Sequence, residues 1–168
     1  GVQTCALPIY PFEGFNRKVY QFNETVDEAV LKPVAQTYQK VTPQPVRTGV
    51  QNFFGNLSDV WSTVNNALQL KPVQTVESFM RVLVNSTFGL YGILDIATEM
   101  RLERHTEDFG QTLGYWGVPS GPYLVLPLLG PSTLRDTASL PVDTQGNLAR
   151  QVDHVPTRNS LLATSVVD

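Results

Sequence analysis

Apolar residues recur at intervals of three and four through the first part of the chain, which places them on one face of an α-helix. The first such stripe predicts a helix over residues 12–32, with polar and charged residues on its other face. Pro33 is then expected to break or kink this helix, or to begin a new turn as its first residue. The stripe is formed by Phe12, Phe15, Val19, Phe22, Val26 and Val30.

The same spacing predicts two more helical segments in the middle of the chain. One follows Thr42-Pro43, a good cap and first-turn pair, and runs to Leu68. Gly55-Asn56 is weak helix material, so this segment can divide into two helices there. The next helix begins at Pro72 and ends within residues 85–92. Its apolar stripe is formed by Val73, Val76, Met80, Leu83 and Val84.

The second half shows no sustained alternation of apolar and polar residues bounded by hairpin turns, so strands are not expected in the core. A short helix is predicted from a cap at Thr106 to about Trp116. The Gly- and Pro-rich residues 117–131 carry apolar side chains on what we expect to be an irregular backbone. Pro131-Ser132 is expected to begin another short helix that ends at Leu140.

The remaining residues are predicted to form a polar loop over 142–154 and a partial helix over 156–167. Together the patterns indicate an all-α protein made of short, interrupted, amphipathic helices. The 12 prolines and 12 glycines agree with this reading, because both residues interrupt helices.

Length and composition narrow the class of protein. The 168 residues suit one domain, and 42% hydrophobic residues are enough to bury a core. Charged residues make up only 16%, against roughly 25% in a typical soluble domain. The net charge of −3 gives no basic surface for nucleic acid. No apolar run approaches the roughly 20 residues of a membrane-spanning helix.

The first nine residues, GVQTCALPI, look like the translation of a sequencing-library adapter. We therefore expect residues 1–9 to be an artefact, with one domain over 10–168. Cys5 then carries no functional weight, and a single cysteine excludes an internal disulfide framework.

The polar side chains show no arrangement typical of catalysis or metal binding. The sequence lacks the phosphate-binding glycine motifs, the zinc-protease motif and the nucleophile elbow. Ser120 is interpreted as a turn serine, and His105 and His154 as solvated side chains. Two distant histidines do not make a transition-metal site. The pattern favours a protein that is not an enzyme, with no catalytic residues, metal or cofactor.

Large apolar side chains stand on adjacent helical positions, as in Phe53-Phe54, Val60-Trp61 and Tyr115-Trp116. One residue of each pair points away from the main apolar stripe. The extra residues either widen the contact with a core or lie at the headgroup depth of a membrane. The same choice applies to Tyr123, and the pattern alone leaves both readings open.

Six motifs stand out along the chain: PFEGFNR (11–17), LKP (31–33), VRTGVQNFF (46–54), NSTFG (85–89), EDFGQTLGYWG (107–117) and GPYLVLPLLGPSTLRD (121–136). Together they resemble the MlaA (VacJ) family of outer-membrane phospholipid-transport lipoproteins, over essentially residues 11–168. Tyr10 stands where the family has Asp. The family's signal peptide and acylated cysteine are missing, and its C-terminal helix continues further, so we expect a fragment at both ends.

The resemblance implies a ring-like all-α protein around a central amphipathic channel that lies in the bacterial outer membrane and opens to the periplasm. It implies a lipid-anchored full-length protein that removes mislocalised phospholipid from the outer leaflet. It further implies transfer to a soluble periplasmic carrier, association with trimeric porins and maintenance of lipid asymmetry. The low fraction of charged residues and the absence of catalytic motifs agree with a channel that transports lipid without covalent chemistry.

Candidate lipid-binding or channel residues follow from this reading. Arg135 is a candidate for orienting a headgroup, although a salt bridge with Asp136 accounts for it more simply. Two other functions stay open: a soluble helical lipid-binding or scaffold domain without a channel, and a lipid hydrolase using His105. The apolar candidates are Phe53, Phe54, Trp116, Tyr123, Leu124 and Leu126.

Overall fold

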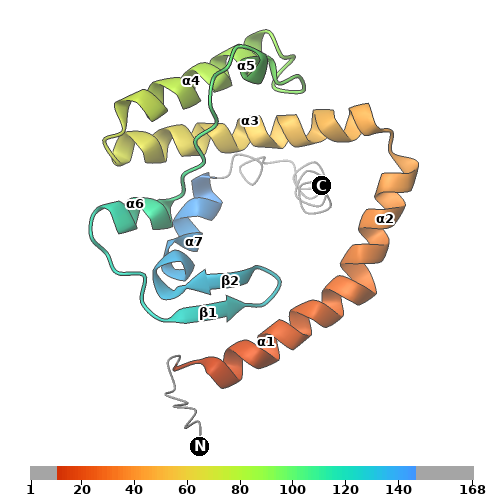
Figure 1. The fold of residues 1–168 in the computed structure, drawn as a ribbon, viewed down its shortest axis with the longest axis vertical. Coiled ribbons are helices and arrows are strands. Elements are labelled where there is room, and N and C mark those ends of the chain that lie inside the picture. The colour runs from red at the N-terminus through yellow and green to blue at the C-terminus, as the bar shows by residue number, and fades with distance from the viewer. Residues whose placement is uncertain (1–10, 147–168) are drawn as a thin grey trace, which may run out of the picture.

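The computed structural model describes residues 11–146 (Figure 1). The predictions for residues 1–10, for the rest of the polar loop with His154, and for the helix over 156–167 lie outside the described residues. The elements are α1 (Glu13–Val26), a π-helical turn η1 (Asp27–Leu31), α2 (Lys32–Val41), α3 (Gln44–Leu68), α4 (Pro72–Thr87), α5 (Ile96–Glu99), α6 (Phe109–Tyr115), β1 (Tyr123–Leu126), β2 (Gly130–Thr133) and α7 (Leu134–Gly146). The all-α prediction is confirmed, with one small sheet added.

The predicted first helix runs on into α2 without a break in the backbone. Pro33 lies in the first turn of α2, where its missing N–H is tolerated, so it begins a new turn and does not end the helix. The change of direction between α1 and α2 coincides with the π-helical turn η1, a known cause of helix bending. In Figure 1, α1, α2 and α3 form one continuous arc.

Helix α3 is a single helix of 25 residues, so Gly55-Asn56 does not divide it. A glycine inside a helix costs about 1 kcal/mol relative to alanine. Packing offsets that cost, because α3 lies along α4 over much of its length (Figure 1). Gly55 also leaves space for another side chain: a Cβ there would lie 2.9 Å from Nη2 of Arg104.

The Gly- and Pro-rich segment is more regular than the sequence indicates. Strands β1 and β2 pair antiparallel, with Val125 opposite Pro131, so the expectation of irregular backbone over the whole segment is wrong. Leu128 and Gly130 adopt left-handed backbone angles of +65° and +81°, which allow the tight connection. Each strand has only four residues, too few for the alternation of apolar and polar residues to be recognised in the sequence.

Helix α7 also departs from prediction, since it begins at Leu134 and continues through Pro141 to Gly146. The predicted end at Leu140 and the loop from residue 142 are therefore wrong up to residue 146. Asp143 explains the extension: its Oδ1 accepts hydrogen bonds from Trp61 Nε1 and from the Phe109 backbone N–H, both at 2.8 Å. These contacts hold α7 against α3 and α6.

Two asparagines of α1 join the beginning of the chain to the hairpin. Asn16 donates to the Tyr123 carbonyl (3.1 Å) and accepts from the Val125 N–H (2.8 Å). Asn23, two turns further along, donates to the Leu126 carbonyl (3.0 Å) and accepts from the Leu128 N–H (2.8 Å). The described elements thus complete a circuit, in which the hairpin returns to α1 (Figure 1).

Most of the buried side chains in the described part of the chain, residues 11–146, are polar. Only four hydrophobic residues are buried there, Val19, Val84, Ala97 and Val125, against twelve polar or charged ones. Soluble domains show the reverse preference. The buried polar residues are Asn16, Asn56, Asp59, Ser62, Asn65, Asn66, Gln69, Ser78, Arg81, Asn85, Thr112 and Ser139.

Replacing Asn16 by alanine is expected to loosen the junction between α1 and β1, because both hydrogen bonds to the strand backbone are lost. We predict faster hydrogen exchange at the Val125 amide, which Asn16 protects directly. The matched control is Gln21→Ala on the exposed side of α1. Equal Val125 exchange rates in the wild type and both variants would contradict the role assigned to Asn16.

Candidate functional site

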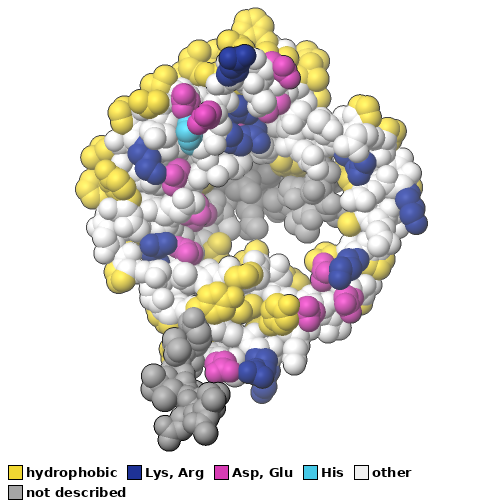
Figure 2. All heavy atoms as spheres, viewed as in Figure 1, with side chains coloured by type: hydrophobic (Ala, Val, Ile, Leu, Met, Phe, Trp, Pro, Cys, Tyr) yellow, Lys and Arg dark blue, Asp and Glu magenta, His cyan; other side chains and the backbone are white. Residues whose placement is uncertain are grey.

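The apolar stripe predicted for α4 faces outward. Val73, Val76, Met80 and Leu83 are 37–64% exposed, and only Val84 of the predicted stripe is buried. Figure 2 shows apolar side chains gathered along the periphery of the molecule, over α4 and around the outside of α3. A stripe that would normally form a core is therefore presented to the surroundings.

The loop after α4 extends this apolar surface. Phe88, Leu90 and Tyr91 are 73%, 62% and 80% exposed. Leu90 and Tyr91 adopt left-handed backbone angles, which cost non-glycine residues about 1–2 kcal/mol each. Asn52 of α3 fixes the loop by donating to the Ile93 carbonyl at 3.0 Å. The protein thus holds bulky apolar side chains outward at a conformational cost.

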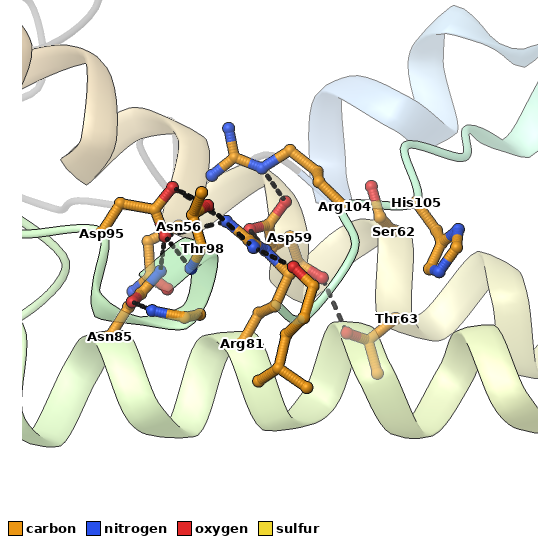
Figure 3. Close-up of polar contacts among 12 residues, drawn as sticks. Asn56, Asp59, Ser62, Thr63, Arg81, Asn85, Asp95, Thr98, Arg104 and His105 are labelled. Carbon is orange, nitrogen blue, oxygen red and sulfur yellow. Dashed lines mark hydrogen bonds and ion pairs between the residues drawn. The ribbon is translucent and has the colours of Figure 1, made fainter. Parts of the chain in front are cut away.

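Beneath the apolar surface, an ionic network joins α3, α4 and the segment after α5 (Figure 3). Its centre is Arg81, which is 1% exposed. Arg81 Nη2 donates to both carboxylate oxygens of Asp95, at 2.9 and 3.0 Å. Nη1 donates to the Leu102 carbonyl at 2.6 Å and to Thr98 Oγ1 at 3.2 Å. The guanidinium therefore ties α4 to α3, through Asp59, and to residues 95–102.

Two carboxylates in this network are shifted in opposite directions. Burial is the largest influence on Asp95 and by itself raises its pKa, but hydrogen bonds from Thr98 and Asn85 and the charge of Arg81 together lower the pKa to about 2. Burial dominates at Asp59 and raises its pKa, although Arg104 and Arg81 oppose the shift. Asp59 lies 3.5 Å from Arg81 Nε and 3.2 Å from Arg104 Nε.

A second polar cluster links the end of α3 to the segment before α6. Gln69 Nε2 donates to Glu107 Oε2 at 2.9 Å, and Lys71 Nζ pairs with Glu107 Oε1 at 2.7 Å. Burial would raise the pKa of Glu107, but these partners lower it overall. His105 was expected to be merely solvated, and this is wrong: its Nε2 lies 2.6 Å from Glu77 Oε2 on α4. The pair fastens the 102–108 segment to α4.

The aromatic pair Phe53-Phe54 lies half-buried on α3, with ring centroids 5.5 Å apart in an edge-to-face arrangement. Both rings line an open apolar groove of about 600 Å³. The other lining residues are Pro45, Val46, Gly49, Val50 and Ile93.

Trp116 stands apart from this groove, at the end of α6. It is 61% exposed, packs edge-on against Tyr115 at 5.7 Å, and donates from Nε1 to the Leu68 carbonyl at 3.1 Å. An exposed indole with a bonded N–H presents its apolar ring to the surroundings.

The other candidates lie on or beside the hairpin. Tyr123 is 40% exposed, whereas Leu124 and Leu126 are half-buried on the opposite face of β1. Arg135 binds Asp136 through Nε at 2.9 Å and its side chain is 18% exposed, so it has the partner that the sequence suggested. The structure therefore distributes the predicted residues over three places.

The sequence reasoning missed the buried polar residues of α3 and α4. A signal for them exists, because they follow helical spacing on α3 at positions 56, 59, 62 and 66, continued by the C-cap residue Gln69, and on α4 at 78, 81 and 85. Each stripe lies beside an apolar one, and convention assigns the apolar stripe to the core.

Replacing Asp95 by asparagine is predicted to destabilise the protein by about 2–3 kcal/mol at pH 7, because buried Arg81 loses the carboxylate that accepts its hydrogen bonds. The folded pKa of about 2 lies below the unfolded value of about 3.9. Stability from ionised Asp95 is thus complete above about pH 4 and is lost as the pH falls toward 2. The variant should lack this part of the acid dependence.

Denaturant unfolding between pH 2 and 7 measures both effects. Glu13→Gln serves as the control, because its pair with Arg17 is largely exposed and should contribute little. A variant Asp95→Asn with wild-type stability and wild-type acid dependence would refute the assignment.

Comparison with known proteins identifies the chain's relatives. A family model described as MlaA lipoprotein matches residues 10–168. An uncharacterised protein of Rickettsia typhi is 40% identical over 135 residues, covering 80% of this chain and 54% of that protein. In Escherichia coli (strain K12), the intermembrane phospholipid transport system lipoprotein MlaA is 43% identical over 130 residues, covering 75% of this chain and 52% of that protein. The chain thus spans about half the length of these curated relatives.

A solved structure, described as the structural basis for maintenance of bacterial outer membrane lipid asymmetry, superposes with a TM-score of 0.80 at 33% identity. The match covers 94% of this chain and 81% of the solved chain. Within residues 11–146, no helix is both long and apolar enough to cross a membrane. The extent of the family match and these identities lead to one conclusion: the chain belongs to the MlaA lipoprotein family.

Proposed function

We propose that the protein transports phospholipid at the bacterial outer membrane, removing mislocalised phospholipid from the outer leaflet and passing it to a soluble periplasmic carrier. The names of the relatives, an intermembrane phospholipid transport system lipoprotein and a protein of outer-membrane lipid asymmetry, support this class of function. In the proposal the full-length protein is lipid-anchored, faces the periplasm and associates with trimeric porins. Transport is non-covalent, without enzymatic activity.

The observation that carries the proposal is the inverted distribution of polarity. Exposed apolar side chains stabilise a protein only where something other than water covers them, at about 25 cal/mol for each Å². The stripe of α4, the loop over 88–94 and Trp116 together present such a surface. Polar contacts join α3 to α4, including Asn56 Nδ2 to Ser86 Oγ at 3.0 Å and Arg81 Nε to Asp59 Oδ2 at 3.5 Å. A lipid surface is the occupant that fits both facts.

A path for lipid needs one wall for the tails and one for the headgroup. Exposing an acyl chain to water costs about 0.8 kcal/mol for each CH₂ group, so the tails require a continuous apolar wall. We propose that the circuit of elements is a ring around an amphipathic channel. Phe53-Phe54 and the hairpin residues Tyr123, Leu124 and Leu126 would contribute its apolar surfaces, with Trp116 on the ring's apolar exterior.

Transfer of fluorescent phospholipid between donor and acceptor vesicles tests the proposal, using the full chain reconstituted in the donors. Leu126→Glu is predicted to reduce transfer at least tenfold, because a carboxylate in the apolar wall opposes tail passage. Helical content by circular dichroism should be unchanged. Leu126→Met is the matched control and should retain transfer.

Three outcomes would contradict the proposal. Transfer that is unaffected by Leu126→Glu would remove the hairpin from the lipid path. A protein that stays monodisperse without detergent and does not float with liposomes would instead support a soluble lipid-binding or scaffold domain. Altered lipid chemistry after incubation would indicate a hydrolase.

A further inference from the structure

The guanidinium of Arg104 forms an ion pair through Nε, whereas its terminal nitrogens Nη1 and Nη2 form none within the described residues. The residue lies between α5 and α6, and its Nε is 3.2 Å from Asp59 Oδ1. No hydrogen bond to Nη1 or Nη2 occurs within the described residues, and the side chain is 37% exposed. Figure 3 shows the Arg104 guanidinium on the side of Asp59 that faces away from α4. The buried Asp59 carboxylate therefore orients the Arg104 guanidinium through Nε and leaves Nη1 and Nη2 available to a ligand.

The position of this fork is built into α3. A Cβ at Gly55 would lie 2.9 Å from Nη2 and 3.0 Å from Nη1 of Arg104. The guanidinium thus rests against the helix where the side chain is missing. Glycine inside a helix costs about 1 kcal/mol.

The charges around Arg104 leave its guanidinium as the accessible group. Arg81 and Arg104 are formally balanced by Asp59 and Asp95, but the Asp59 side chain is only 2% exposed. Arg81 is buried and already bound to Asp95 and the backbone. Arg104, with a side chain that is 37% exposed, is therefore the cationic group of this network that reaches the surface.

The surrounding space is large enough for a headgroup. An open pocket of about 500 Å³ lies over Arg104, with the Thr98 and Leu102 side chains in its lining. Arg101 and Glu103 stand exposed on its rim, and their formal charges cancel. The planar fork of arginine matches the oxygens of a phosphate in a bidentate manner.

We propose that Arg104 binds the phosphodiester of a phospholipid headgroup through Nη1 and Nη2, with Asp59 and Gly55 fixing the orientation of its guanidinium. This inference rests on the proposed function and adds to it the group that recognises the cargo. Recognition through phosphate selects phospholipids from lipids without phosphate and is indifferent to what the phosphate carries.

Gly55→Ala is the sharpest variant, because it displaces the fork without removing a charge. Alanine favours the helix, so the thermal stability of α3 should not fall. Gly14→Ala in α1 is the matched control, since a Cβ there meets nothing within 4 Å. Arg104→Gln removes the charge itself, and Arg104→Lys keeps the charge without the fork.

The measurement is competition between two lipids with the same acyl chains, phosphatidylglycerol and monogalactosyl diacylglycerol, for the full chain in detergent, read by native mass spectrometry. The wild type and Gly14→Ala should prefer the phospholipid. Gly55→Ala and Arg104→Gln should lower that preference about tenfold, as expected for lost charge-assisted hydrogen bonds. Arg104→Lys should retain an intermediate preference.

Three results would overturn the assignment. An unchanged preference in both Gly55→Ala and Arg104→Gln, with transfer between vesicles intact, would reject Arg104 while leaving the proposed function standing. A wild type that binds neither lipid would reject both. Binding of inorganic phosphate, measured by phosphorus NMR, with an affinity equal to that for the phospholipid would identify a site for free phosphate instead of a headgroup.

Discussion

The buried guanidinium of Arg81 is the interaction on which the rest of the described structure depends. It holds α4 to Asp59 of α3 and to Asp95, and it caps the Leu102 carbonyl in the connection to α6. Burying a charge is costly unless partners satisfy it, and here every nitrogen has one. Because polar contacts join the helices from within, their apolar faces are free to point outward.

That inversion links stability to function. A helix pair held by an apolar seam would have no reason to expose a second apolar face, whereas a seam of Asn, Ser, Asp and Arg leaves the stripe on α4 available for lipid. Polar side chains also hold α1 to the hairpin, because Asn16 and Asn23 bind the backbone of β1, which lies more than 100 residues away in the sequence. Polar side chains fix the geometry, and apolar ones meet the surroundings.

Periodicity predicted the helices well and the location of the core poorly. The stripes of residues 12–32 and the start at Pro72 were sufficient for α1 and α4, and the family resemblance was confirmed by the family match. The hairpin was missed because four-residue strands carry too little alternation, and α7 because contacts of Asp143 extend it past Pro141.

The apolar stripe of α4, at positions 73, 76, 80 and 83, has the same sequence pattern whether a protein core or lipid covers it. Only the buried polar stripe beside it distinguishes the two cases, and its contacts come from residues distant in sequence.

In the proposed function, the apolar face of α4 contacts lipid. Single spin labels on the full chain, in a Cys5→Ser background and reconstituted in phospholipid bilayers, test it through collisions with oxygen and with a water-soluble nickel complex. Labels at Val76, Met80 and Leu83 should favour oxygen, as acyl chains do, whereas a label at the exposed Glu103 should favour nickel. Equal access of nickel to all four positions would show that water, and not lipid, covers the apolar face of α4.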